Sequence, residues 1–458
     1  MNSRIEKDSI GKLTIKDDKY YGINTQRAID NFQIRVNKTS LDFIKQIARI
    51  KYAAATANEK LGRLETQKSR AIKIAATEII DGKWDDQFII PEIQGGAGTS
   101  TNMNVNEVIA NRGLEILGHQ KGEYKYLSPQ DDVNAGQSTN DVYPSAGKLT
   151  TYLKSEKLNS VLSKLIEKLN EKAKKFSNVK KIGRTQLQEA VPTTVGNSFQ
   201  AYSDGLSRCK SQLAQTEQLM LELNLGGTAI GTGVNTSKGY KEKLYPELQR
   251  IYSLKIHPAA DLIDGTQNLD SAVQISGSLK ALAISMSKMC HDLRLLSSGP
   301  KSGFNEIYLP ARQAGSSIMP GKVNPVIPEI VSQIAFQVIG NDITITLAAE
   351  SGELELNAFE PVIFHNLFES IDLLNNACSM LIDKCIPGIK VNKEKCAKDL
   401  ANSVETVTEL TPIIGYETAS EIVTESIKTG VGVYKLLKDK KIYDRNEATA
   451  RALARVLN

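Results

Sequence analysis

Apolar residues recur along the middle of the chain at alternating spacings of four and three positions, which is the period of an amphipathic helix. One series comprises Ile275, Leu279, Leu282, Met286, Met289, Leu293 and Leu296. A second series comprises Leu158, Leu162, Leu165, Leu169 and Phe176. Stripes of this length are typical of long helices that pack against one another, so we predict a coiled coil or a helix bundle here.

Polar segments that contain glycine interrupt this helical pattern. They read QGGAGTSTNMN at 94–104, GQSTND at 136–141, GRTQLQEAVP at 183–192 and GSSIMPGKVNP at 315–325. Their Thr, Ser, Asn and Gln side chains can surround a polar ligand with neutral hydrogen-bond donors. Taken singly, each segment is more typical of a turn or a helix cap. Taken together, they predict one polar site between helices.

The segment 315–325 is the most informative of these. Gly315 and Gly321 allow backbone conformations that are closed to other residues, and the two prolines of the segment restrict φ, so the segment suits a shaped loop. Lys322 adds a full positive charge, which suits a carboxylate or a phosphate. The alternative is a glycine-rich connector whose lysine is merely solvated.

A helix is predicted to follow this loop. Asn324 and Pro325 have the residue types of an N-cap and a first helical residue. The apolar residues behind them are Ile330, Ile334 and Val338. The positive end of that helix would strengthen the attraction of the loop for an anion.

Length and composition indicate a globular protein of about three domains. Of the 458 residues, 41% are hydrophobic and 24% are charged, and the net charge of +5 is too small and too dispersed to indicate nucleic-acid binding. The start MNSRIEKDSIGK lacks the apolar core of a signal peptide, and we expect no apolar run to approach membrane-spanning length. We therefore expect a cytoplasmic protein that binds neither nucleic acid nor membrane.

The domain boundaries are predicted from changes of pattern along the chain. Residues 1–140 form an N-terminal domain and residues 141–395 a central helical-bundle domain. Residues 396–458 form a small C-terminal domain, because the chain becomes more charged and less periodic there.

Cysteine and histidine usage argues against several kinds of site. The five cysteines are Cys209, Cys290, Cys378, Cys385 and Cys396, without CxxC spacing, and we expect them to be reduced and mostly buried. The four histidines are scattered and form no HExxH arrangement. We expect no metal centre and no required cofactor, with activation by a divalent ion such as Mg²⁺ as an alternative.

The four polar segments, in this order, resemble those of the aspartase/fumarase superfamily, and more narrowly of the aspartate ammonia-lyases. The resemblance extends over nearly the whole chain, from YYGINTQRAIDNF through GGTAIGTGVN to PGIKVNKEKC. It implies a mainly all-α fold of three domains, with a central long-helix bundle that assembles into a tetrameric helical core. It also implies a homotetramer whose active sites each draw on three subunits, and a small dicarboxylate substrate.

The resemblance assigns roles to residues that match the motifs of the family. Ser316 corresponds to the base that removes a proton from the carbon next to the β-carboxylate of the substrate. The residues that match the holders of the β-carboxylate are Thr99, Ser138, Thr139 and Ser317. Those that match the α-carboxylate pocket are Thr185, Gln186, Lys322 and Asn324. Asn140 lies where the amino group is held.

Gln186 bears on which reaction is catalysed. Fumarases place histidine at this position, and a histidine can exchange protons near neutral pH, whereas glutamine cannot titrate. Hydroxide leaves badly without a proton, whereas an ammonium group departs as neutral ammonia. The runs TSTNMN and QSTND also resemble aspartases more closely than fumarases.

The segment LSPQDDVN departs from the pattern of the relatives. It lacks the histidines that relatives carry at the positions of Ser128 and Asp132, which argues against fumarase and against a second carboxylate site there. We therefore expect reversible deamination of L-aspartate to fumarate and ammonia through a β-carbanion. The alternatives are a fumarate hydratase of the class II type and a catalytically silent, structural member of the fold.

Overall fold

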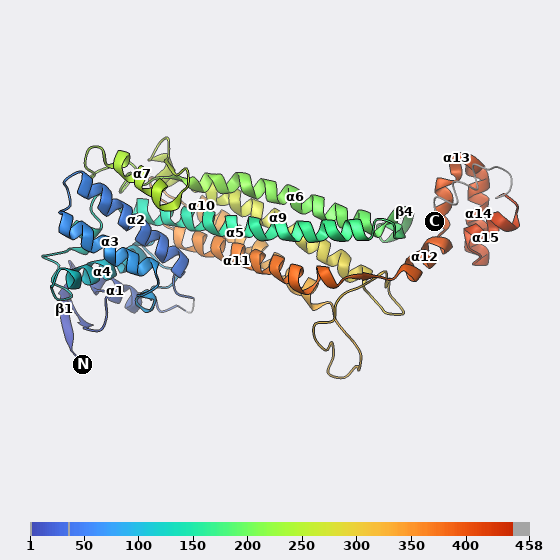
Figure 1. Cartoon of the computed structure of the whole chain (residues 1–458), viewed down its shortest axis with the longest axis horizontal. Coiled ribbons are helices and arrows are strands. Elements are labelled where there is room, and N and C mark those ends of the chain that lie inside the picture. Colours follow the sequence, from blue (N-terminus) through green and yellow to red (C-terminus); the bar gives the residue numbers. More distant parts are fainter. Residues whose placement is uncertain (1, 35–36, 443–458) are drawn as a thin grey trace. The chain divides into compact units, whose positions relative to one another are not determined.

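The computed structural model describes residues 2–34 and 37–442, which fold mostly into helices (Figure 1). The chain divides into two compact units. The first unit consists of Met1–Asn159, Ser211–Lys280 and Gln337–Leu374, and the second of Ser160–Lys210, Ala281–Phe336 and Asn375–Asn458. The mainly all-α fold class is confirmed. The three domains stay a prediction, and residues 443–458 of the third lie outside the described residues.

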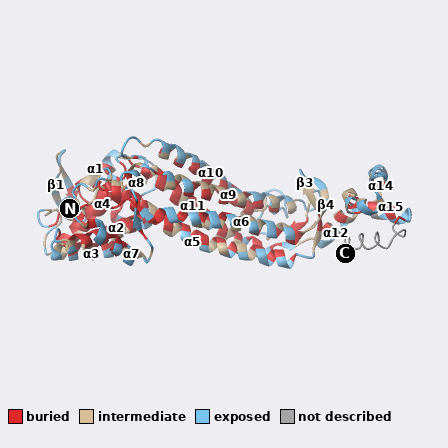
Figure 2. Cartoon of the chain, turned by 90° about the horizontal axis from the view of Figure 1, so that it is seen from above, coloured by how far each residue is buried: buried red, intermediate tan, exposed pale blue. Residues whose placement is uncertain are grey.

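Three helices pack together in the N-terminal part of the first unit: α2 (Leu41–Lys60), α3 (Thr66–Ile80) and α4 (Thr99–Ile116). Helix α2 buries its alanines at 53–55, whose small side chains allow neighbouring helices to approach closely. Helix α4 is buried over most of its length (Figure 2). Its four asparagines are all buried, namely Asn102, Asn104, Asn106 and Asn111. Polar groups at such depth need partners, and Asn102 finds one in Thr139, a residue of the site described below.

Short elements surround these helices in the first unit. The strands are β1 (Ser3–Lys7), β2 (Lys12–Lys16), β5 (Glu222–Leu223) and β6 (His257–Pro258). The helices are α1 (Ile23–Asn31), α7 (Tyr240–Tyr252) and α8 (Asp264–Gln267), with single turns at Asp85–Gln87, Pro129–Val133 and Gln218–Leu221.

Five long helices make up the helical bundle: α5 (Thr139–Lys175), α6 (Val195–Glu217), α9 (Asp270–Leu296), α10 (Val326–Glu350) and α11 (Glu360–Lys384). The boundary between the two units falls within each of them. Within the first unit, hydrogen bonds between these helices join Lys154 to Asp372, Asn341 to Ser370, Ser276 to Asp342, Thr216 to Ser278 and Asn159 to Glu217. The five helices therefore contact one another in a closed ring.

The two apolar stripes predicted from the sequence are the buried faces of α9 and α5. Every residue of both series is buried except Leu296, which is half-buried at the end of α9. All five cysteines are free and buried, as expected.

The second unit contains a two-stranded antiparallel hairpin and a small C-terminal group of helices. The strands are β3 (Lys180–Thr185) and β4 (Gln188–Thr194), with β7 (Ile307–Tyr308) paired to β8 (Lys390–Val391). The helices are α12 (Lys393–Asn402), α13 (Thr411–Ile414), α14 (Tyr416–Thr429) and α15 (Val433–Asp439), with turns at Ile386–Gly388 and Val404–Glu409. Leu410, Ile422 and Leu437 belong to a small core of their own.

Helix α10 corrects one expectation. Among the described residues it is the one helix that is long and apolar enough to cross a membrane, with a mean hydropathy of 1.3 over its most apolar window, 44% of which is buried. The expectation that no apolar run approaches that length was wrong. The physical reason is that α10 is apolar on more than its buried face, since Phe336, Ile343 and Leu347 are exposed.

Candidate active site

The first turn of α5, together with the residue before it, Ser138, carries three of the predicted residues. The Ser138 hydroxyl accepts a hydrogen bond from the Asn140 backbone N–H at 3.2 Å. The Thr139 hydroxyl accepts one from the side-chain amide of Asn102 at 3.0 Å. Asn102 lies one turn beyond Thr99 on α4. The structure thus brings the helix that begins at Thr99 against the turn that carries Ser138, Thr139 and Asn140.

The position of Thr99 depends on the glycine before it. Gly98 is the N-cap of α4 and has a left-handed backbone, with φ at 86°. A Cβ added to Gly98 would lie 2.3 Å from the ring of Tyr143. Only glycine can therefore begin α4 at this place without displacing that ring.

A buried lysine lies behind the same turn. Lys51 has no exposed surface, and its ammonium donates a hydrogen bond to Asn134 Oδ1 at 2.7 Å. Burial lowers the pKa of Lys51 to about 7, and burial raises the pKa of the nearby Asp141 to about 6. The sequence analysis did not identify this pair. A lone lysine beside the alanine run of α2 is a signal that could have pointed to it.

Thr185 and Gln186 lie at the tip of the β3–β4 hairpin in the second unit. Thr185 ends β3, and the two residues of the turn, Gln186 and Leu187, have φ at 55° and 64°. Two positive φ values suit a tight hairpin turn, but they are strained for side chains larger than glycine. The hairpin presents Thr185 and Gln186 at the surface of the unit. The sequence pattern predicted a polar segment here and did not indicate a hairpin.

A buried carboxylate anchors that hairpin. Glu306 is fully buried and pairs with two residues of β3: its Oε2 lies 2.8 Å from Lys181 Nζ, and its Oε1 accepts a hydrogen bond from Arg184. The Arg184 guanidinium also stacks over the ring of Phe304. Because Arg184 directly precedes Thr185, these contacts fix the end of β3 that carries the predicted residue.

The loop 315–325 is closed at its base by backbone and side-chain hydrogen bonds. The Gly315 N–H donates to the Lys322 carbonyl at 2.8 Å, and the Asn324 side chain donates to the Gly315 carbonyl at 2.8 Å. Within the loop, the Ser316 hydroxyl oxygen accepts hydrogen bonds from the N–H groups of Ile318 and Met319, at 3.2 and 3.0 Å. Two N–H donors on one oxygen favour its anionic form.

The prediction that Asn324 is an N-cap was wrong. Its side chain bonds to Gly315 instead, and α10 begins at Val326. Of the apolar residues predicted behind it, Ile334 and Val338 are buried, whereas Ile330 is exposed. The Asn324 amide bonds to the Gly315 carbonyl across the loop. It therefore does not cap the helix.

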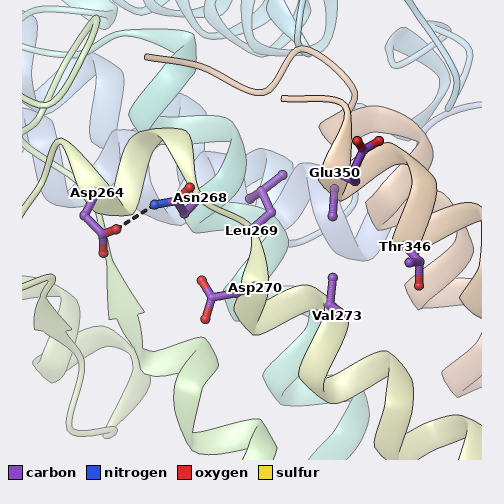
Figure 3. Close-up of a pocket in the computed structure, with 8 residues that line it drawn as sticks. Asp264, Asn268, Leu269, Asp270, Val273, Thr346 and Glu350 are labelled. Atoms are coloured by element: carbon purple, nitrogen blue, oxygen red, sulfur yellow. Dashed lines mark hydrogen bonds between the residues drawn. The ribbon is translucent and has the colours of Figure 1, made fainter. Parts of the chain in front are cut away.

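Two cavities lie among the described residues, and the predicted site residues line only one of them. One in the second unit, of about 1170 Å³, is lined by Lys322 and Asn324 together with His291, Arg294 and Glu329. The other, in the first unit, has a volume of about 590 Å³ and is lined by Asp264, Asp270 and Glu350 (Figure 3). None of the predicted site residues lines this second, acidic cavity. The cavity at Lys322 has the positive charge that a carboxylate substrate requires.

The predicted residues fall into two groups. Those in the first unit are Thr99, Ser138, Thr139 and Asn140. Those in the second unit are Thr185, Gln186, Ser316, Ser317, Lys322 and Asn324. Ser317 and Lys322 are exposed on the loop. The structure joins the residues of the first group through α4 and the first turn of α5, and it joins Lys322 and Asn324 to Gly315 within the loop. The assignment of all ten to one site stays a prediction.

Comparison with known proteins places the chain among lyases. Residues 11–340 match a family described as lyase. The chain is 49% identical to the aspartate ammonia-lyase of Pseudomonas aeruginosa over 451 residues, which cover 98% of this chain and 95% of that protein. It is 47% identical to the aspartate ammonia-lyase of Escherichia coli K12, over 97% of this chain and 94% of that protein. The chain belongs to the aspartase/fumarase superfamily.

Solved structures of the superfamily share its fold. The fumarate lyase:delta crystallin from Brucella melitensis superposes with a TM-score of 0.95 at 45% identity, over 99% of both chains. The class II fumarase from Schistosoma mansoni gives 0.92 at 35% identity, over 97% of both. The resemblance stated from the motifs is thereby confirmed.

Proposed function

We propose that the protein is an aspartate ammonia-lyase, an enzyme that reversibly converts L-aspartate to fumarate and ammonia. The near-full-length identity with aspartate ammonia-lyases supports the reaction. The observation that carries the mechanism is the Ser316 hydroxyl with its two backbone N–H donors. A serine is ordinarily a poor base, and such donors stabilise the alkoxide that could accept a proton.

The chemistry proceeds in two steps. The Ser316 alkoxide takes a proton from the β-carbon of L-aspartate, and the electron pair left behind spreads onto the β-carboxylate, which then carries two negative charges. That pair next forms the carbon–carbon double bond, while the C–N bond breaks and its electrons leave with neutral ammonia. The group most in need of stabilisation is the β-carboxylate, and preorganised donors are worth roughly 10²–10³ in rate each.

We assign the other predicted residues to the two carboxylates and the amine. Thr99, Ser138, Thr139 and Ser317 hold the β-carboxylate, and Thr185, Gln186, Lys322 and Asn324 hold the α-carboxylate. The cavity beside Lys322 and Asn324 supports the second assignment. Asn140 holds the amino group. The exposed, non-titrating amide of Gln186 suits a reaction whose leaving group needs no acid.

We further propose that the enzyme is a homotetramer. Helix α10 exposes Phe336, Ile343 and Leu347 at spacings of seven and four, so they share one face. A large apolar face of this kind suits burial against further copies of the chain. The division of the predicted site residues into two groups agrees with a site completed by other subunits. The predicted cytoplasmic location and the absence of a required cofactor stay predictions.

One assay tests the reaction. Purified protein is given L-aspartate and, separately, L-malate, and fumarate is followed by its ultraviolet absorbance. We expect fumarate from L-aspartate without added cofactor. Turnover of L-malate alone would replace the proposal with fumarase, and inactivity on both substrates would leave a silent member of the fold.

Subunit complementation tests the shared site. The variants Ser316→Ala and Thr99→Ala are each expected to be inactive, and mixing them under conditions that exchange subunits should restore part of the activity. The control is mixing two samples of the same variant. If subunits demonstrably exchange and no activity returns, the two residues do not meet across a subunit boundary.

A further inference from the structure

The turn at 138–141 is held by a second segment of the first unit, residues 224–229, which none of the assignments above uses. Four hydrogen bonds join the two segments, and we call this arrangement the 224–229 clamp. Asn224 donates from its side-chain amide to the Asn140 carbonyl at 2.9 Å. Asp141 accepts from the N–H groups of Gly226 and Thr228, both at 3.0 Å. The side-chain amide of Asn140 donates to the Ala229 carbonyl at 2.8 Å.

The last of these bonds decides which way the Asn140 amide points. A backbone carbonyl can only accept a hydrogen bond, so the NH₂ group of Asn140 must face Ala229. The amide is planar, and its oxygen and nitrogen diverge from the same trigonal carbon. Fixing the nitrogen on Ala229 therefore turns Oδ1 the other way, as a hydrogen-bond acceptor.

The clamp itself is built to hold one geometry. Asn224 is buried, and its other two bonds are also made, one to the Thr266 hydroxyl at 3.0 Å and one from the Ser145 hydroxyl at 3.1 Å. Asp141 is fully buried and also accepts from the Ser138 N–H at 2.9 Å. Thr228 has φ at 57°, a conformation that a β-branched residue adopts only when its surroundings impose it. The bond from its N–H to Asp141 is such a constraint.

We propose that Asn224 and Asp141 are positioning residues that fix Asn140 with its amide oxygen toward the substrate, so that the site selects an amine at that carbon. The inference rests on the proposed function, in which Asn140 holds the amino group. An acceptor oxygen forms a strong hydrogen bond with an ammonium group. It forms none with a substrate that carries no hydrogen-bond donor on that carbon. Asn224 and Asp141 are both buried and bonded to the chain at 138–140, so they would act on the substrate only through Asn140.

The test compares ligands that have the amine with ligands that lack it. Asn224→Ala should raise KM for L-aspartate, and KM for ammonia in the reverse direction, by roughly tenfold or more, the usual scale of a bond to a charged group. KM for fumarate and the inhibition constant of succinate, which has both carboxylates and no amine, should change less than about twofold.

Asn111→Ala is the matched control. Asn111 is also buried in the first unit and also makes three bonds, to the Tyr20 carbonyl, to the Tyr124 hydroxyl and from the Gly122 N–H. It should lose comparable stability while leaving the ratio of KM for L-aspartate to the succinate inhibition constant unchanged. A loss caused only by weaker folding would appear equally in both variants.

Asp141→Asn repeats the test without removing side-chain volume. It should give the same split between amine-bearing and amine-free ligands. The proposal is refuted if the constants for amine-bearing and amine-free ligands rise together, or if neither set rises. It is also refuted if neither variant folds, because the role of the clamp would then be folding rather than amine selection. A wild-type protein without activity on L-aspartate would refute the proposed function instead.

Discussion

Replacing Gly98 with alanine should both destabilise the first unit and displace Thr99. The left-handed backbone at Gly98, with φ at 86°, costs an alanine about 1–2 kcal/mol. The new methyl would also lie 2.3 Å from the Tyr143 ring. That ring is 2% exposed and packs edge-on against Phe43 at 4.8 Å, so it has little room to move. Overpacking adds about 1–3 kcal/mol, for a total of about 2–5 kcal/mol.

Gly96→Ala separates the two contributions. Gly96 has nearly the same backbone, with φ at 84°, but a Cβ there would lie 4.0 Å from its nearest neighbour, Thr99 Cβ. It should therefore cost only the backbone contribution of about 1–2 kcal/mol. The comparison is urea unfolding followed by circular dichroism, together with kcat for L-aspartate. Equal losses in Gly96→Ala and Gly98→Ala would refute the argument that Tyr143 excludes a side chain at Gly98.

Three further predictions concern other parts of the molecule. Ser316→Ala should lower kcat by about 10²–10⁴ and abolish hydrogen exchange at the β-carbon in deuterated water; near-normal exchange would mean that another group is the base. Glu306→Gln removes the buried negative charge that pairs with Arg184 and Lys181, so urea unfolding should show a loss of about 3–5 kcal/mol, with a higher KM for L-aspartate; unchanged stability would contradict the anchoring role. The hydrogen bond from His365 Nδ1 to Glu92 Oε2, at 2.6 Å, raises the pKa of His365 above its usual 6.5. Its stabilising contribution should therefore be complete below pH 6.5 and fade as pH rises through the raised pKa, and thermal unfolding of His365→Gln should lack that pH dependence.

Periodicity predicted the long helices well because their burial is regular. The series on α9 from Ile275 to Leu293 is buried at every position, as an amphipathic stripe requires. The hairpin β3–β4 could not be read in the same way. Its turn, Gln186 and Leu187, has two positive φ values without glycine or asparagine, so the usual turn signal is missing.

The sequence predicted a set of site residues, but it did not predict their hydrogen-bond partners. The motifs named Ser138, Asn140 and Ser316, but nothing in the sequence showed that Ser316 accepts two N–H groups or that Asn140 is held by Ala229. Asn324 shows the limit most clearly. Its residue type suits a helix cap, but a carbonyl nine positions earlier is close enough in space to take its amide.

The distribution of two scarce residue types offers separate reporters for the two units. The single tryptophan, Trp84, lies in the first unit, with its ring 4.2 Å from that of Tyr20 and its indole N–H bonded to Glu78. All five cysteines lie in the second unit and are buried, and burial raises the pKa of Cys378 and of Cys385 to about 12. Thiol reagents need an exposed thiolate, so at neutral pH they label these residues only when the second unit opens. Intrinsic fluorescence and thiol labelling in a single denaturation experiment would therefore give the order in which the two units unfold, without any introduced probe.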